Sequence, residues 1–600
     1  MWRSLRFGDS GRLCLWLAWL AALVLYLPTL AFGIVGYDDA WLVRDNWVVQ
    51  TPSWQSLRTI FCELESAGRY TLAPEYLPLR DLSVMLDFAI WGDGFGGFHL
   101  TNVLLYLALI GAWFLMLVEF GIERRTAGLA LLIFAVHPVH AESVAWLAER
   151  KGLLGMTFAG LAGFSYARFR AGSAHTWLVF SAAAGVCAVW SKAHSAFALA
   201  ALVGLELVWP ARRASARRAL AGLGIVGVTS LAAFVPVVWL AAGTAIVGDG
   251  ARAPAARWAM ALGSHGFYFR LASATLENAV SYPISTLGPS ALELGIGALG
   301  IALLLAVAAL PARFTRVELR GAALLWLFGW LPVSYVLMPL QMVFVADRYL
   351  LIPSMGVALA IAALCARISG PLLRAGVVAI VIGLFAVRSV AARESWSSAE
   401  RLWARAVESN PSDGAAWSMY AEALAEGGRL DLAAKAVEQG LERARHPRLL
   451  LRRALLRLRS GDAVGGRAAM REAATGGEAR AMSNLALLLL EDGRTDEALD
   501  WARRGAQMMD MYAPAQRALG RVALRAKRSE EALAAFERAF ALDPRACTNR
   551  FNLALAELEL RRVDAARVHV EPCANDAELG AQSKAMLVEI ARRQTPRGGH

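Results

Sequence analysis

Cysteine is scarce in this sequence, with six in 600 residues, and so few thiols exclude a small scaffold built on disulfides. Charged side chains are also few, because Asp, Glu, Lys and Arg make up 18% of the chain against 57% for hydrophobic residues. That balance excludes a soluble protein with ordinary polar loops. The formal net charge of +12 does not indicate nucleic-acid binding, since much of the arginine lies in short clusters between apolar segments. Such clusters are typical of cytoplasmic loops in membrane proteins.

Apolar segments fill the chain from Leu13 to about Val390, and each has roughly the 20 residues that a helix needs to cross a bilayer. The first is predicted to be an uncleaved helix, since no clean small-residue cleavage site follows it. Residues 242–290 include an amphipathic stretch that either crosses, re-enters or lies along the membrane. We predict about eleven spans, at 13–34, 99–120, 127–145, 152–169, 174–191, 194–210, 219–241, 291–310, 321–340, 348–366 and 372–391.

Arginine clusters give the predicted orientation. They precede the first span and follow every even-numbered span, and they include Arg3, Arg6, Arg12, Arg124, Arg125, Arg212 and Arg213. The positive-inside rule then puts the N-terminus in the cytoplasm and everything after the last span outside. Three polar segments share the outer side: residues 35–98, HPVHAESVAWLAERKG at 137–152 and QMVFVADRY at 341–349. Ionisable groups near membrane depth are costly and usually functional.

From Arg393 onward the chain is charged, rich in alanine and internally repeated. Ala498 and Ala532 lie 34 residues apart, and the same step separates the small residues Ala486, Gly520 and Ala554. This period, with two helices per unit, is that of tetratricopeptide repeats. The segment SAERLWARAVESNP aligns with EALAAFERAFALDP, so a lone second helix of a repeat begins soon after the last span.

The predicted architecture is therefore all-α. A polytopic membrane domain occupies residues 1–392, and a tetratricopeptide α-solenoid occupies residues 393–600. Cys547 begins the last repeat's first helix, and Cys573 lies just past the end of its second helix. These positions share one end of an antiparallel helix pair, so the geometry allows a disulfide in an oxidising compartment.

Five segments, in this order along the chain, resemble the transmembrane and tetratricopeptide repeat-containing protein O-mannosyltransferases and their bacterial relatives. They are YDDAWLVRDN, FHLTNVLLYL, HPVHAESVAWLAERKGLL, VADRYLLIPSMG and a W-x-x-x-x-x-LW sequence that leads into the repeats. The resemblance implies a GT-C-fold glycosyltransferase. Such an enzyme would move a sugar, mannose by default, from a polyprenyl-phosphate donor to a Ser or Thr hydroxyl of an exported protein, and the repeats would bind that acceptor protein.

Asp38 and Asp39 directly follow the first span and are the predicted catalytic residues. Transfer to a hydroxyl needs a general base, and a carboxylate can take the proton or hold a divalent ion. Two adjacent carboxylates on irregular backbone do not easily point the same way, so we expect one to do the chemistry and the other to position it or bind metal. The cofactor considered is a divalent ion, Mg²⁺ or Mn²⁺, held by Asp38 or Asp39. The alternative is a pair of solvated acids at a helix end.

Basic residues of the outer segments are the predicted contacts to the donor phosphate. Guanidinium groups bind phosphate bidentately, and the predicted contacts are Arg348, Arg150, Lys151 and Arg80, with Lys192 weaker. Leu77 stands where the family often has arginine, which leaves Arg80 as the candidate in that segment. Supporting roles are predicted for His137, His140, Glu142, Asp347 and Tyr349. The alternatives are an interfacial loop with His and Trp at headgroup level, and an Asp–Arg pair that caps a helix.

Two functions remain open from the sequence. The first is the glycosyltransferase, whose partners are the lipid-linked sugar, the acceptor protein and the bilayer, with no nucleic acid. Its composition, rich in alanine and arginine but poor in lysine, favours a bacterial inner membrane with the repeats in the periplasm. The second is a non-enzymatic membrane-anchored scaffold for protein–protein interaction. Leu77 favours the scaffold, whereas the polar clusters gathered on one face argue against it.

Overall fold

The computed structural model describes residues 10–594 except 66–68, 73–74, 209–215, 243–253, 274–277, 283–287, 312 and 337–344. These residues form helices and turns but no strands, which confirms the predicted all-α class. The chain divides into two compact units, residues 1–66 with 72–410 and residues 67–71 with 411–600. Arg3, Arg6, Arg212 and Arg213, which carry part of the predicted orientation, lie outside the described residues, as does much of 242–290.

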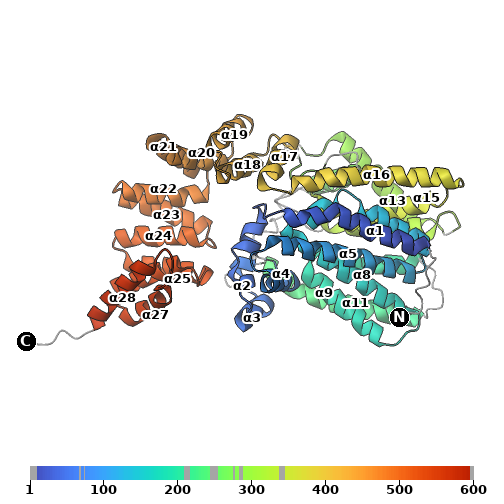
Figure 1. The fold of residues 1–600 in the computed structure, drawn as a ribbon, viewed down its shortest axis with the longest axis horizontal. Coiled ribbons are helices and arrows are strands. Elements are labelled where there is room, and N and C mark those ends of the chain that lie inside the picture. Colours follow the sequence, from blue (N-terminus) through green and yellow to red (C-terminus); the bar gives the residue numbers. More distant parts are fainter. Residues whose placement is uncertain are drawn as a thin grey trace, which may run out of the picture. The chain divides into compact units, whose positions relative to one another are not determined.

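In the first unit every predicted span overlaps one or two helices, which Figure 1 labels. They are α1 (Ser10–Tyr26), α5 (Phe95–Glu119), α6 (Arg124–Ala135), α7 (His140–Ala145), α8 (Arg150–Arg170), α9 (Thr176–Ser191), α10 (Ser195–Val208), α11 (Ala216–Ala242), α13 (Ala291–Ala309), α14 (Val317–Trp330), α15 (Pro353–Cys365) and α16 (Pro371–Ser395). Helices α1, α5 and α8 lie side by side (Figure 1). An added Cβ at Gly128 of α6 would come within 2.4 Å of the Gly11 carbonyl on α1, so glycine permits this close approach.

Five of these helices are long and apolar enough to cross a membrane: α1 with its 3-10 extension, α5, α11, α13 and α16. Three more, α9, α10 and α15, are apolar but shorter. The count of eleven spans therefore stays a prediction. The predicted third span is two helices rather than one, because the chain turns at Pro138 between α6 and α7 and proline has no N–H to continue the ladder.

Shorter elements of the first unit surround the polar segments. These are α2 (Trp47–Gln50), α3 (Trp54–Cys62), α4 (Pro78–Trp91), the 3-10 helices Leu147–Glu149 and Asp347–Leu350, α12 (Pro254–Ala272) and α17 (Ala399–Ser409). Helix α17 belongs to this unit, where the following Asn410 side chain donates to the Tyr282 carbonyl at 3.2 Å. The units thus divide after Asn410, whereas the sequence had indicated a boundary at 392/393.

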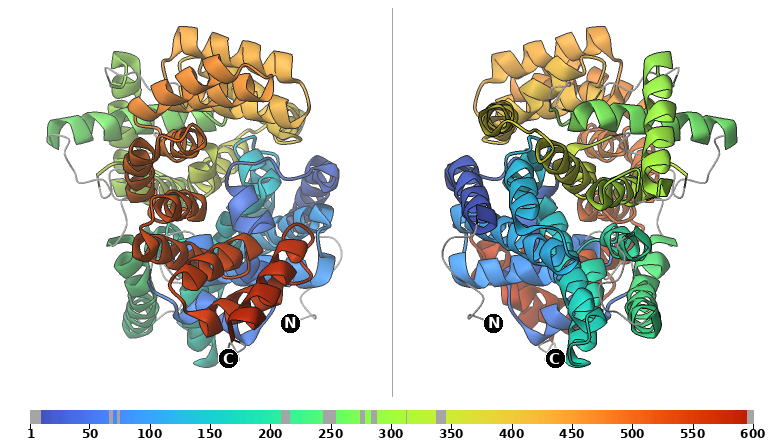
Figure 2. Two further views of the ribbon diagram at one scale, coloured as in Figure 1. Left: turned by 90° about the vertical axis from the view of Figure 1, so that its left-hand side faces the viewer. Right: turned by 90° about the vertical axis from the view of Figure 1, so that its right-hand side faces the viewer.

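The second unit is a row of helix pairs that follows an arc (Figures 1 and 2). Its helices are α18 (Gly414–Glu426), α19 (Leu430–Arg443), α20 (Pro447–Arg459), α21 (Ala463–Thr475), α22 (Ala479–Glu491), α23 (Thr495–Met508), α24 (Ala513–Arg525), α25 (Ser529–Leu542), α26 (Cys547–Glu559), α27 (Val563–Val570) and α28 (Gly580–Gln594). The repeated small residues are needed for packing: a Cβ added at Gly520 would lie 2.4 Å from the Phe536 ring. The Cys547–Cys573 disulfide is confirmed, with a Cα–Cα distance of 5.5 Å.

Candidate active site

The loop after α1 takes an unusual backbone path just before the two predicted catalytic residues. Gly36 and Tyr37 both have positive φ, at 71° and 52°, a region that bulky residues rarely occupy. The Tyr37 ring is held by Trp146 and Trp403, at centroid distances of 5.0 and 5.5 Å. Aromatic packing therefore fixes the turn that directs the next two side chains.

Asp38 and Asp39 point into different surroundings. Asp39 is 1% exposed and accepts hydrogen bonds from the backbone N–H groups of Ala148, at 2.9 Å, and Val35, at 3.5 Å. Burial raises the pKa of Asp39 to about 7, although these two hydrogen bonds oppose the shift. Asp39 thus fastens the first polar segment to the second. Its neighbour Asp38 is only partly buried and accepts from the Trp41 indole at 3.3 Å.

Asp38 lies in the field of several charges. Burial raises its pKa, while the cations Lys151 and Arg348 act to lower it and the Glu75 carboxylate acts to raise it. Lys151 in turn donates to Glu75 at 3.0 Å. Of the two acids, Asp38 is therefore the one that lies among charged side chains, whereas Asp39 is bound to the backbone.

Arg348 reaches the same region from the third polar segment, residues 341–349. Its guanidinium donates to Glu142 at 2.5 Å, and its backbone N–H donates to the other oxygen of that carboxylate at 2.8 Å. The guanidinium also lies over the rings of Trp146, at 5.5 Å, and Tyr349, at 5.0 Å. Glu142, Arg348 and Tyr349, each named from the sequence, thus lie together, although the sequence did not indicate this pairing.

Arg150 and Arg80 have other partners. Arg150 is fully buried, forms an ion pair with Asp87 at 2.5 Å and donates to Asn102 and to the Phe98 carbonyl. Arg80, 3% exposed, is bound to Asp81 and to the Leu72 carbonyl, both at 2.7 Å. Leu77 is buried as well. These two arginines tie segments of the first unit together, because a buried guanidinium needs all its donors satisfied, and neither of them lines the two cavities described next.

His137 and His140 are fully buried. His140 lies between the Tyr106 hydroxyl, at 2.7 Å, and the Ser354 hydroxyl, at 2.8 Å, so it links α7 to α5 and α15. His137 contacts the Ala272 carbonyl at 3.0 Å. Within the described residues no three His, Cys, Asp or Glu side chains form a group that could hold a metal ion.

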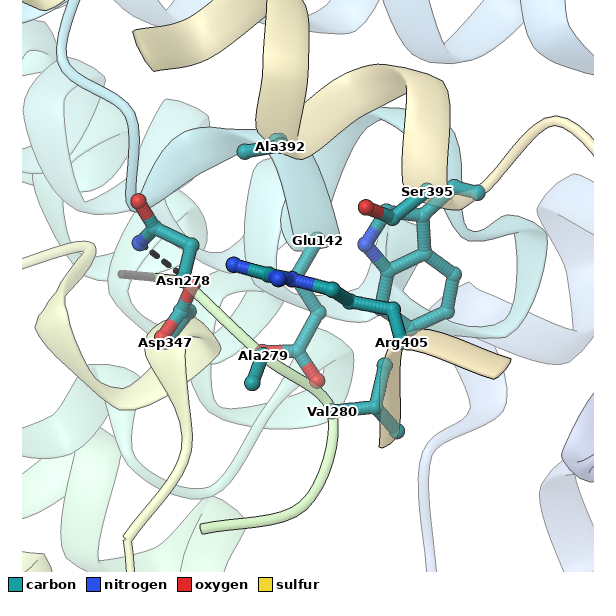
Figure 3. A pocket seen from close by; sticks show the side chains of 10 residues that line it. Glu142, Asn278, Ala279, Val280, Asp347, Ala392, Ser395 and Arg405 are labelled. Carbon is teal, nitrogen blue, oxygen red and sulfur yellow. Dashed lines mark hydrogen bonds between the residues drawn. The ribbon is translucent and has the colours of Figure 1, made fainter. Parts of the chain in front are cut away.

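Glu142 and Asp347 line a small cavity with Asn278, Trp396 and Arg405 (Figure 3). Asp347 accepts from Asn278 at 2.7 Å and from the Tyr282 hydroxyl. Burial, together with the nearby Glu142 carboxylate, raises the pKa of Asp347 to about 8. The Arg405 side chain extends from α17 into the cavity (Figure 3). Asn278, Tyr282 and Arg405 were missed by sequence reasoning. The first two lie in the stretch at 242–290 whose structure was left open, and Arg405 lies in a helix that resembles part of a repeat.

A second cavity combines positive and apolar walls. Lys192, His194 and Arg348 line it together with Met156, Leu351 and Ile352. Lys192 donates to the buried Glu149 carboxylate, and His194 stacks on Tyr349 at 5.6 Å. The two cavities have volumes of about 10 and 20 Å³, room for roughly one or two waters. The place of Lys192 beside this cavity could not be predicted from the sequence, because it depends on Glu149 of another segment.

Comparison with known proteins bears on both units. The tetratricopeptide repeat family matches residues 386–448 and 517–570. The first match begins within α16, so the end of the last predicted span serves as the partner of α17, which the sequence had left as a lone second helix. Solved repeat structures include Pseudomonas aeruginosa pilF, with 18% identity and coverage of 30% of this chain and 83% of that one, but the TM-score of 0.28 carries no argument.

The curated relatives are protein O-mannosyl-transferases. The chain is 35% identical over 153 residues to Tmtc1 of Drosophila melanogaster, covering 24% of this chain and 17% of that protein. It is 33% identical over 176 residues to human TMTC2, covering 28% of this chain and 20% of that protein. The match therefore spans a fifth or less of these relatives. It confirms the resemblance found in the sequence, and the apolar helices are those of a membrane protein.

Proposed function

Because the chain is a relative of the protein O-mannosyl-transferases, we propose that it is a membrane glycosyltransferase of the GT-C class. The donor is a polyprenyl-phosphate sugar, with mannose the default, and the acceptor is a Ser or Thr hydroxyl of an exported protein bound by the repeats. The proposed location is a bacterial inner membrane, with the outer segments and the repeats in the periplasm.

The observation that carries the proposal is the second cavity with Asp38 nearby. Lys192 and Arg348 supply positive charge to the lining of the cavity, and Met156, Leu351 and Ile352 supply apolar surface. A phosphate joined to a hydrocarbon chain has the same two parts. Arg348 also acts on Asp38 through its charge, so the carboxylate and the phosphate contacts come together from separate outer segments.

In the proposed reaction Asp38 takes the proton of the acceptor hydroxyl as its oxygen attacks the anomeric carbon of the sugar. The bond from that carbon to the phosphate oxygen breaks, and the leaving polyprenyl phosphate gains negative charge. Arg348 and Lys192 stabilise that charge, in competition with Glu142 and Glu149, which hold them now. Asp39 positions the loop. Attack from the side opposite the phosphate inverts the anomeric centre.

A divalent ion fits this donor set poorly. Asp38 faces the cations Lys151 and Arg348, and Asp39 is already bound to two backbone N–H groups. The proposed steps therefore use no metal, and we expect transfer to persist in a chelator such as EDTA.

The test is sugar transfer by the purified full-length protein in detergent, from polyprenyl-phosphate mannose to a Ser/Thr peptide, followed by mass spectrometry. We expect transfer by the unaltered protein and a loss of about 10²–10⁴-fold in Asp38→Asn, with the same thermal unfolding. The second candidate is the scaffold, which the small size of both cavities and the buried Leu77 favour. No transfer with any polyprenyl-phosphate sugar, or full activity in Asp38→Asn, would favour it.

A further inference from the structure

His194 is a residue of the second cavity that the proposed reaction does not use. It lies in the turn between α9 and α10, where the backbone N–H of Ser195 donates to the Lys192 carbonyl at 2.9 Å. The side chains of Lys192 and His194 both line the cavity, and Arg348 joins them from the segment at 341–349. Three nitrogen-bearing side chains from two segments thus contribute to its lining.

The three nitrogen groups differ in their present partners. Lys192 donates to the Glu149 carboxylate, and Arg348 donates to the Glu142 carboxylate at 2.5 Å. The Nε2 atom of His194 is buried as well, but within the part of the chain that the structure describes it has no hydrogen-bond partner. A buried polar atom without a partner destabilises the folded chain. In the lining of a cavity, such an atom indicates a partner that comes from outside the chain.

The surroundings of this imidazole favour an anionic partner. The ring lies against Tyr349, with centroids 5.6 Å apart and planes 23° from parallel, so the direction of its edge is fixed. The charges that act on the ring include those of Lys192, Lys151 and Arg348, opposed by the Glu75 carboxylate. A site with this excess of cations disfavours a cationic ligand and favours an oxygen that carries negative charge.

Gly152 leaves room for a ligand beside the lysine of the cavity. A Cβ added at Gly152 would lie 3.4 Å from the Lys192 Nζ and 2.8 Å from a Glu149 carboxylate oxygen. A side chain at this position would therefore fill the space next to the lysine nitrogen. Met156 and Leu351 add apolar surface to the same lining, which suits an anion that is joined to a hydrocarbon chain.

We propose that His194 donates from Nε2 to the phosphate oxygen that becomes free when the sugar leaves, an inference that rests on the proposed function. The polyprenyl-phosphate sugar is a phosphodiester with two free oxygens, which Lys192 and Arg348 match. When the bond from the anomeric carbon to oxygen breaks, its electron pair stays on the phosphate oxygen, and the product is a phosphomonoester with three free oxygens and more negative charge. His194 supplies the third hydrogen bond and transfers no proton.

This contact differs from the other two in what it displaces. Lys192 and Arg348 must leave carboxylates to reach the phosphate, whereas Nε2 of His194 has no partner among the described residues to lose. A hydrogen bond that forms only as the bond to the sugar breaks stabilises the transition state more than the bound donor. The site should therefore distinguish a phosphomonoester from a phosphodiester through His194.

The test measures equilibrium binding of farnesyl phosphate and of its methyl ester to the full-length protein in detergent. The first is a phosphomonoester like the leaving group, the second is a phosphodiester like the donor, and neither requires sugar transfer. His194→Phe keeps a ring against Tyr349 but lacks the nitrogen. Its affinity for the monoester should fall about tenfold, and its affinity for the diester by less than about twofold.

Two results would contradict this inference in different ways. Equal losses for the two ligands, or an unchanged affinity for the monoester, would overturn the role of His194 and leave the proposed function standing. If the unaltered protein binds neither ligand, the phosphate cavity of the proposed function is wrong, and the inference about His194 falls with it.

Further variants separate the nitrogen of the ring from its packing. His194→Gln keeps an N–H donor and should retain the monoester affinity within about threefold, whereas His194→Met, with neither ring nor donor, should repeat the loss. An equal loss in His194→Gln would assign the effect to packing alone. His175→Phe is the matched control, because His175 is exposed and stacks on Phe169 at 5.7 Å, and it should change neither affinity.

Inorganic phosphate distinguishes a lipid-linked ligand from a free one. It should compete at least about tenfold more weakly than farnesyl phosphate, because it makes no contact with the apolar part of the lining. Equal competition by inorganic phosphate would overturn the assignment of the site to a lipid-linked phosphate.

Discussion

Arg150 and Arg480 both lie in the first turn of a helix, yet their surroundings have almost nothing in common. Arg150 is fully buried, with Asp87, Asn102 and backbone carbonyls around its guanidinium. Arg480 is exposed on α22 and lies over the Tyr512 ring. In the apolar first unit a buried arginine needs partners from the protein, because an unpaired buried charge costs several kcal/mol. In the polar second unit an exposed arginine needs no such partner, because water solvates its charge. A fully buried basic residue in a motif is therefore structural, whereas one that lines a cavity or lies on the surface keeps its charge within reach of a ligand.

The largest expected effect is on stability, in a direct test of this contrast. Arg150→Met leaves Asp87 buried without its partner and should lower the free energy of unfolding of the first unit by about 3–5 kcal/mol. Arg480→Met should change stability by no more than about 0.5 kcal/mol. Thermal unfolding in detergent compares the two, and a similar small loss for both would show that Arg150 is not structural.

The second effect is the pH dependence of the stability of the first unit. It arises from Asp39, whose pKa is raised to about 7 in the folded protein. The folded form then binds the proton more tightly than the unfolded form, so its stability is highest at low pH. It falls as the pH rises through 7, by roughly 4 kcal/mol in all. Asp39→Asn should remove this slope, and hydrogen exchange of the first unit between pH 4 and 8 measures it.

The stability of the repeats should depend on pH in the opposite direction, and at lower pH. Side-chain hydrogen bonds from Arg471 and Arg503 lower the pKa values of Glu497 and Glu531. The ionised Glu497 and Glu531 stabilise the folded repeats at pH values above the pKa of glutamate in the unfolded chain. This stabilisation is lost as the pH falls through the lower pKa values that the two groups have in the folded protein. The same exchange experiment follows the repeats as an internal control, and a common slope for both units would contradict the distinction.

The third effect concerns the end of the solenoid. Reduction, or Cys573→Ser, removes the Cys547–Cys573 link, and closing a loop of this size is worth about 3 kcal/mol. Because repeats contact only their neighbours, hydrogen exchange should rise in α26–α28 and leave the first unit unchanged. Free thiols in a non-reduced digest would show that the bond does not form.

The smallest effect is that of Arg348→Lys on transfer. Lysine keeps the charge but loses the planar fork that binds phosphate bidentately, so kcat/KM should fall about tenfold, or 1.4 kcal/mol. Arg80 is buried, so Arg80→Lys should lower the stability of the protein and leave the KM for the donor nearly unchanged. If Arg348→Lys changes stability and leaves KM and kcat unaltered, the residue is only the partner of Glu142.

The repeats were largely predictable, because a 34-residue step reflects a local helix pair that recurs. Helices of the first unit were predictable for the same reason, since apolar length is a local property. The turn at Pro138 inside a predicted span and the membership of α17 in the first unit were not. Both depend on packing between distant segments, as the Asn410–Tyr282 contact illustrates.

The residues of the candidate site could be named from the sequence, but the contacts between them could not. Asp38, Lys151, Glu142 and Arg348 were all named from the sequence, but Glu142 and Arg348 lie 206 residues apart and only the fold joins them. For Arg150 the sequence predicts a charge close to the membrane, but it does not say whether that charge faces a cavity or a buried carboxylate. The partner is Asp87, which lies 63 positions earlier in the chain, and no local sequence pattern identifies it.

Tyr37 has a consequence for how the loop that carries Asp38 is held. Its left-handed backbone costs the loop roughly 1–3 kcal/mol, and its two ring contacts return about 0.5–1.5 kcal/mol each. The two amounts are of similar size, so the aromatic contacts offset the backbone strain and the hydrogen bonds of Asp39 hold the loop against Ala148. Cavities of about 10 and 20 Å³ are too small for a sugar, so a bound donor has to displace the side chains that line them.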